Sequence, residues 1–128
     1  MTAEPIHRLG DLQLAIMQAL WKLGAAGVTE VHKQIGGHLA YTTVATMLRK
    51  MEDRGLVCHQ EDGRRFIYRA AVSAEEVSRS MSNRLVDRLF EGSLARTVSH
   101  LLDTREVDRG ELAQLERMIR ARRNRPQR

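Results

Sequence analysis

The chain has 128 residues, of which 42% are hydrophobic and 29% charged, and its formal net charge is +5. This composition excludes a disordered chain, and the length allows one ordinary domain or two very small ones. The aromatic content of 4% is too low for the stacking platform of a single-strand binder, so the basic charge favours duplex DNA as an anionic partner. One cysteine excludes an intrachain disulfide, and the lack of a signal peptide or long apolar run predicts a cytoplasmic protein.

The first predicted helix follows a polar arm, Met1 to Arg8, that we expect to be loosely held. The helix begins at Asp11 and ends at Gly24, a residue type common just after helix C-termini. Trp21 is interpreted as an anchor in the core or at its edge, because one indole without stacking partners forms no ligand site. The apolar face consists of Leu12, Ala15, Ile16, Ala19, Leu20 and Leu23.

A second, shorter helix is predicted after a turn at residues 24–27. Thr29 is expected to cap this helix, which runs from Glu30 to about Gly37. Val31 and Ile35 lie on one side of it and are expected to be buried. The glycines at its end release the chain into the third helix.

The third predicted helix, Ala40 to Arg54, has two chemically distinct faces. Its apolar stripe is made by side chains at i, i+3, i+4 and i+7, namely Val44, Met47, Leu48 and Met51. The opposite face carries Thr42, Thr46, Arg49 and Asp53, flanked by Ala45 and Lys50. Hydroxyl and methyl groups followed by cations suit base edges and phosphates. Since most exposed faces of this kind are only solvated, the hairpin that follows decides the interpretation.

Two short strands, Leu56 to Gln60 and Phe66 to Ala70, are predicted after the third helix. They are joined by a turn with Asp62 and Gly63 at its tip. Three helices followed by a hairpin predict a winged helix-turn-helix, with the third helix entering the major groove. Arg64 and Arg65 follow the turn, where a wing reaches the phosphate backbone.

A second helical unit begins at Ser73, which forms a capping box with Glu76. Gly92 ends its first helix, a shorter helix follows, and Asp108 caps the last one. About 55 residues of such helices bury too little surface to be stable alone, so we expect a homodimer. The predicted dimerisation residues are Val77, Met81, Leu85, Leu89, Leu94, Val98, Leu101, Leu102, Leu112, Leu115 and Ile119.

The predicted fold class is mainly α, with an α+β winged helix. Residues 1–72 form a three-helix winged helix-turn-helix with a two-stranded wing, and residues 73–128 form a three-helix dimerisation domain with a basic C-terminal tail. No enzyme, cofactor, metal site or small-molecule substrate is expected. Adjacent carboxylates such as Glu52 and Asp53 diverge on a helix and are read as solvated, and the histidines form no metal-binding pair. Cys58 is interpreted as a buried small hydrophobe on the face opposite His59.

Three segments in this order resemble the penicillinase and methicillin-resistance repressor family: LGDLQLAIMQALW, AYTTVATMLRKMEDRGLV and FEGSLARTVSHLLD. The similarity covers roughly residues 9–120. It implies a homodimer with one winged helix on each operator half-site and an intertwined C-terminal helical domain. It also implies repression of β-lactamase or resistance genes, or of other operons.

Carried over by position, the family's DNA-contacting helix corresponds to Tyr41, Thr42, Thr43, Thr46 and Arg49, and the wing to Arg64 and Arg65. Thr43 lies to the side of the exposed face, which suits a phosphate contact or a cap. Members inactivated by a membrane sensor protease resemble one another at an Asn-Phe cleavage step, where this chain has His100-Leu101. The copper-responsive members' cysteine-rich tail is replaced by RARRNRPQR.

The predicted function is therefore a homodimeric transcriptional repressor that binds a pseudopalindromic operator in duplex DNA. One alternative is a winged-helix module that docks onto a protein, with Thr46 and Arg49 facing that partner. Another is a regulator that responds to oxidation or to a ligand, with the signal entering at Cys58 or between the two domains.

Overall fold

The computed structural model of the protein describes residues 7–126. The chain divides into two compact units, Met1–Arg84 and Leu85–Arg128, and the division falls within helix α4 (Ala74–Leu89). The predicted domain boundary at residue 73 coincides with the start of that helix. The first eleven residues of α4 thus belong to the unit that precedes it.

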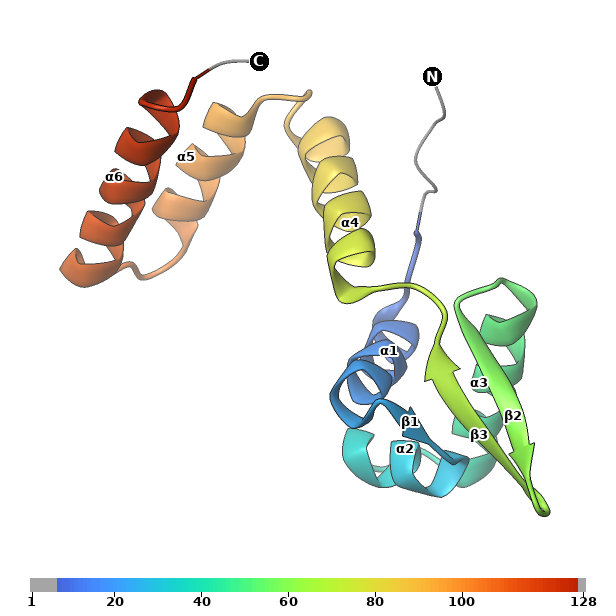
Figure 1. Cartoon of the computed structure of the whole chain (residues 1–128). Coiled ribbons are helices and arrows are strands. Elements are labelled where there is room, and N and C mark those ends of the chain that lie inside the picture. The colour runs from blue at the N-terminus through green and yellow to red at the C-terminus, as the bar shows by residue number, and fades with distance from the viewer. Residues whose placement is uncertain (1–6, 127–128) are drawn as a thin grey trace. The chain divides into compact units, whose positions relative to one another are not determined.

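Within residues 7–126, the first unit contains three complete helices, most of α4 and a small sheet (Figure 1). In chain order its elements are α1 (Asp11–Leu23), β1 (Ala25–Ala26), α2 (Val28–Ile35), α3 (Tyr41–Asp53), β2 (Val57–Asp62) and β3 (Arg65–Ala70). After α4, the second unit contains α5 (Leu94–Thr104) and α6 (Arg109–Arg123). The predicted mainly α fold with a winged helix is confirmed.

The sheet has three antiparallel strands in the order β1-β3-β2. The sheet therefore has one strand more than the predicted two-stranded wing. Ala25 pairs with Arg69 and Ala26 with Tyr68, although residues 24–27 were expected to form only a turn. A two-residue strand is too short to show alternation in sequence, and only its pairing with β3 defines it. The wing strands also extend further than predicted, and Gly63, at φ 65°, begins the loop between Asp62 and Arg65.

Helix α2 begins earlier than predicted. Its N-cap is Gly27, whose carbonyl accepts a hydrogen bond from the amide of Val31 at 3.1 Å. Thr29 therefore lies inside the first turn and does not cap the helix. The helix ends at Ile35, before Gly36 adopts a φ of 69°, a conformation that favours glycine. Val31 is fully buried as predicted, and Ile35 packs partly against the core.

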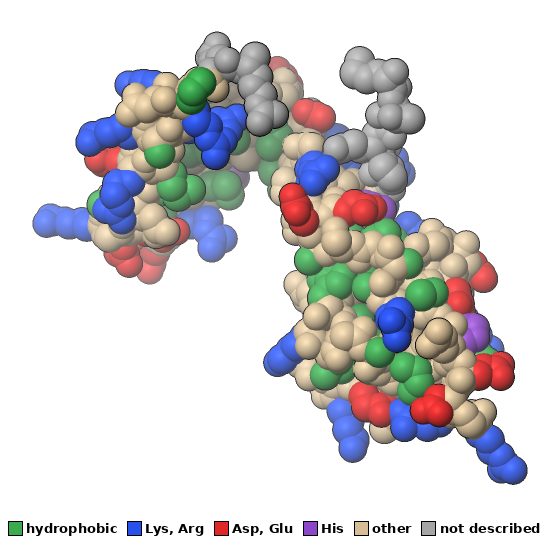
Figure 2. Space-filling view, viewed as in Figure 1, with side chains coloured by type: hydrophobic (Ala, Val, Ile, Leu, Met, Phe, Trp, Pro, Cys, Tyr) green, Lys and Arg blue, Asp and Glu red, His purple; other side chains and the backbone are tan. Residues whose placement is uncertain are grey.

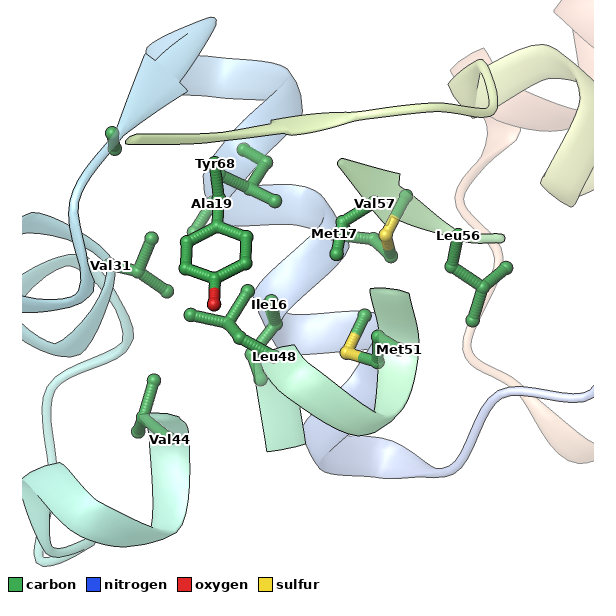
Figure 3. Packing of buried hydrophobic residues seen from close by; sticks show 12 residues of the cluster. Ile16, Met17, Ala19, Val31, Val44, Leu48, Met51, Leu56, Val57 and Tyr68 are labelled. Atoms are coloured by element: carbon green, nitrogen blue, oxygen red, sulfur yellow. The ribbon is translucent and has the colours of Figure 1, made fainter. Parts of the chain in front are cut away.

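The core of the first unit lies between α1, α3 and the sheet (Figure 3). Met17 is fully buried although the predicted face of α1 omitted it, and Leu23, which was included, is 40% exposed. Helix α1 contacts α2, α3 and β3, so its buried face is wider than one stripe. Trp21 lies at the core edge, where its Nε1 donates to the carbonyl of Val72 at 3.0 Å.

The helices of the second half begin at the predicted caps. Ser73 Oγ accepts from the amide of Glu76 at 3.0 Å, and Asp108 Oδ1 accepts from the amide of Glu111 at 2.7 Å. Among the described residues, α6 contains no buried side chain. No described helix combines the length and apolar character that crossing a membrane requires.

Candidate nucleic-acid interface

Helix α3 separates a buried face from a polar one. Val44, Leu48 and Met51 are fully buried, and Met47 packs against the same core, so the predicted apolar stripe is confirmed. On the other side, the predicted polar residues are exposed: Thr42, Thr46, Arg49, Lys50 and Asp53. The folded helix thus leaves this row of hydroxyl groups and cations free of the core.

The beginning of α3 is fixed by the loop that precedes it. His32 Nε2 lies 2.7 Å from the carbonyl oxygen of Leu39, which accepts a hydrogen bond from the ring. The same ring meets Tyr41 edge-on, with centroids 6.3 Å apart. Tyr41 itself is 49% exposed. Thr43 is also exposed, and its amide donates to the carbonyl of Ala40 at 3.1 Å, so it belongs to the first turn.

The two wing arginines have different surroundings. Arg64 is exposed and makes no hydrogen bond or ion pair with any residue between 7 and 126. Arg65 is ion-paired with Glu30 of α2. The hydrogen bond from Arg65 is the main reason that the pKa of Glu30 is lowered. The sequence did not predict this partner, because an acidic residue in the first turn of a helix is common and gives no sign of a contact with the wing.

A carboxylate at the end of α3 ties that helix to the wing. Glu52 accepts a hydrogen bond from the backbone amide of His59 at 3.2 Å, and its oxygens lie 2.7 Å from His59 Nδ1. The His59 ring stacks on Phe66, with centroids 4.1 Å apart and planes at 15°. Glu52 is therefore engaged by the hairpin, and its interpretation as a solvated charge was wrong.

Arg54, the C-cap of α3, connects this helix to α1 and to the residues before α1. Its Nη1 donates to Gln13 Oε1 at 3.3 Å and its Nη2 to the carbonyl of Arg8 at 3.1 Å. Next to Arg8, the His7 ring lies 2.9 Å from Glu76 Oε2 and its amide donates to Ser80 Oγ at 2.9 Å. Residues 7 and 8 of the predicted loose arm are therefore fixed; the rest of that arm lies outside the described residues.

Cys58 lies on β2 and is exposed, so the expected buried environment was wrong. The alternation along the strand explains the difference: His59 is the side chain that turns toward α3 and Phe66, and Cys58 takes the opposite face. Within residues 7–126, no group of three or more potential ligands among His, Cys, Asp and Glu could hold a metal ion.

The predicted dimerisation residues differ in exposure. Val77 is only 1% exposed and is already buried within the first unit. Met81, Val98 and Leu115 are partly buried. The others are exposed: Leu85, Leu89, Leu94, Leu101, Leu102, Leu112 and Ile119, together with Met118, which sequence reasoning missed. Figure 2 shows such hydrophobic side chains at the surface of the second unit.

Three helices, an antiparallel hairpin and the exposed face of α3 define this protein as a winged-helix protein. The model of the penicillinase repressor family matches residues 9–121, and the chain belongs to that family. Its members are transcriptional repressors, so this protein is a transcription regulator and not an enzyme.

Two curated relatives are similar to almost the whole chain. The penicillinase repressor of Bacillus licheniformis is 24% identical over 122 residues, which cover 94% of this chain and 95% of the relative. The transcriptional regulator BlaI of Mycobacterium tuberculosis is 31% identical over 120 residues, with 87% of each chain covered. The solution structure of monomeric Bacillus licheniformis BlaI with the blaP half-operator is 26% identical, covers 56% of this chain and 90% of that chain, and has a TM-score of 0.49.

Proposed function

We propose that this protein is a homodimeric repressor that binds a pseudopalindromic operator in duplex DNA and acts in the cytoplasm. The observation that carries the proposal is the exposed face of α3, where Thr42, Thr46 and Arg49 project away from a fully buried opposite face. A helix of this kind can enter the major groove with its first turns, where each base pair presents a distinct pattern of donors and acceptors.

The side chains of this face divide into two roles under the proposal. Thr42, Thr46 and Arg49 share the central line of the face and contact base edges. The residues beside this line and on the wing contact phosphates, which set the register without reading sequence: Tyr41, Thr43, Lys50, Arg64 and Arg65. The His32 contact to the carbonyl of Leu39 supports these roles, because it fixes the approach to the first turn of α3.

Dimerisation is supported by the apolar surface of the second unit. Leu89 and Leu94 are 69% and 67% exposed, and Ile119 is 59% exposed. Exposed side chains of this size, within so short a unit, support the proposal that another copy of the chain covers this surface. A symmetric dimer presents two α3 helices and therefore requires an operator with two related half-sites.

The names of the relatives support a resistance-type target. The Bacillus licheniformis relative is called a penicillinase repressor, and this chain covers 95% of its length. We therefore include genes for β-lactamase or related resistance functions among the proposed targets. In the proposed mechanism, the bound dimer represses such genes by excluding polymerase from the promoter.

Footprinting tests the proposal directly. The purified protein is applied to DNA upstream of its own and neighbouring genes at two salt concentrations. A protected inverted repeat, with half-sites about one helical turn or slightly more apart, is the expected result. Diffuse protection that disappears at the higher salt concentration would mean only nonspecific phosphate binding and would refute an operator.

A further inference from the structure

A carboxylate of α2 holds one of the two wing arginines in the first unit. Arg65 Nη2 donates a close hydrogen bond to Glu30 Oε1. Glu30 lies in the first turn of α2, and Arg65 is the first residue of β3. Arg64, next to it, has no such partner among residues 7–126. One wing arginine is thus free for an external anion, and the other already has an internal one.

The backbone at the start of α2 accommodates this pair. A Cβ atom at Gly27 would lie 2.5 Å from Arg65 Nη2 and 2.8 Å from Glu30 Oε2, so a larger residue would push the two side chains apart. The hydrogen bond from Arg65 is the largest cause that lowers the pKa of Glu30. Glu30 therefore carries its negative charge at neutral pH, where it resembles a phosphate oxygen facing Arg65.

The pair is also open to exchange. The side chains of Arg65 and Glu30 are 56% and 44% exposed, and exposed ion pairs contribute little to stability because water screens them. Oε2 of Glu30 is shielded from solvent yet has no hydrogen-bond partner in the described part of the chain. A phosphate offers Arg65 a bidentate arrangement with both acceptor oxygens used. DNA phosphate can thus replace Glu30 without disrupting the core.

We propose that Glu30 competes with DNA phosphate for Arg65, an inference that rests on the proposed operator-binding function. On random DNA, where α3 makes few base contacts, Arg65 stays with Glu30. On the operator, α3 fixes the wing against the backbone and Arg65 transfers to a phosphate. Glu30 therefore withholds one phosphate contact from random DNA, and on the operator the ion pair of Arg65 and Glu30 must break before that contact forms. Glu30 thus weakens binding to both duplexes without touching DNA itself.

Salt titrations on a random-sequence duplex and on the protected operator test this competition. Glu30→Gln is expected to tighten binding to the random duplex roughly three- to tenfold, with at least as large a gain on the operator, where the ion pair no longer has to break. It should also steepen the slope of log K against log salt on random DNA by about 0.9, the value for one additional phosphate contact. Glu61→Gln is the matched control, because it removes the same charge from β2 in the same hairpin, where Glu61 is exposed.

A double-mutant cycle identifies the group through which Glu30 acts. In an Arg65→Gln background, Glu30→Gln should have no more effect than Glu61→Gln. Competition is refuted if Glu30→Gln has only the effect of the control in the native background, or if its effect persists without Arg65. It is also refuted if Glu30→Gln weakens binding to both duplexes, because the ion pair would then serve only to hold the wing in place. Glu30→Ala, checked for folding by circular dichroism, provides an independent second variant. If the unmodified protein protects no operator in the footprint, the proposed function is refuted together with this inference.

Discussion

Arg49 is the longest side chain on the central line of the exposed α3 face, three residues after Thr46. If it contacts guanine, Arg49→Ala is expected to weaken operator binding by about 1–3 kcal/mol, because a bidentate arginine–guanine contact contributes that much discrimination. Binding to random DNA should change much less. Titrations of both duplexes measure the difference, with Lys50→Ala as the adjacent-cation control. Equal losses on both duplexes would assign Arg49 to a phosphate instead.

The buried phenol of Tyr68 is expected to make folding stability depend on pH in the alkaline range. It is 2% exposed among Val31, Leu48 and other core side chains (Figure 3), and burial raises its pKa, with a further contribution from Glu52 and an opposing one from Arg49. The folded state thus favours the neutral phenol. Tyr68's contribution is fully present below its unfolded pKa, near 10, and is lost as pH rises through the higher folded value.

Tyr68→Phe should therefore reduce the loss of stability between about pH 9 and pH 12, because the substituted ring cannot ionise. Urea unfolding midpoints at several pH values measure this effect. Tyr41→Phe, at a site that is 49% exposed, is the control and should reduce the alkaline loss far less, because Tyr41 makes only the smallest contribution to the raised pKa of Tyr68. If both variants retain the full loss, another group causes it.

Between elements, the contact from Glu52 to His59 connects α3 to the wing. Glu52→Ala leaves the His59 amide without its acceptor and is expected to cost about 1 kcal/mol of folding stability, since both side chains are only partly buried. Urea denaturation measures the cost. Asp53→Ala, the exposed neighbour, should have almost no effect, and an equal loss in the two variants would contradict a specific role for Glu52.

How far the sequence predicts each element depends on where its partners lie. The two faces of α3 were correctly predicted, because buried and exposed positions alternate with one local period. The caps at Ser73 and Asp108 were also predicted, since their partners are three residues away. In contrast, β1 exists only through its pairing with β3, and the burial of Met17 depends on the several elements that surround α1.

The candidate site shows the same limit. Exposure of the polar residues on α3 follows from periodicity, whereas the partners of Glu52 and Arg65 come from other elements. His59 lies seven positions from Glu52, and Glu30 lies 35 positions from Arg65. Side-chain contacts between elements have no local spacing rule. Charged pairs therefore appeared in sequence as solvated residues or phosphate ligands, and only the fold identified their internal partners.

Assembly is a property of the whole molecule, and substitutions on the exposed apolar surface of the second unit test it. Leu89→Glu and Ile119→Glu replace side chains that are 69% and 59% exposed, so neither change should disturb the fold of one chain. Each is expected to raise the dimer dissociation constant at least about tenfold, because burying one such side chain contributes roughly 1.5–3 kcal/mol. Sedimentation equilibrium measures the constant.

Leu23→Glu provides the matched control for assembly, since Leu23 is 40% exposed but lies at the end of α1 in the first unit. It should leave the dissociation constant unchanged. Stable homodimers have dissociation constants below about 10 micromolar. If the unsubstituted protein is monomeric at tens of micromolar, dimerisation through this surface is contradicted.

The strand order β1-β3-β2 leaves the outer edge of β2 without a neighbouring strand from residues 7–126. Such an edge offers backbone donors and acceptors to a strand from another molecule, the first step toward sheet-like aggregates. Here the amide of His59 is occupied by Glu52, and Glu61 and Asp62 place negative charges at the strand's end. Helix α3 therefore also protects the sheet, and partial unfolding of its last turn would expose a template for aggregation.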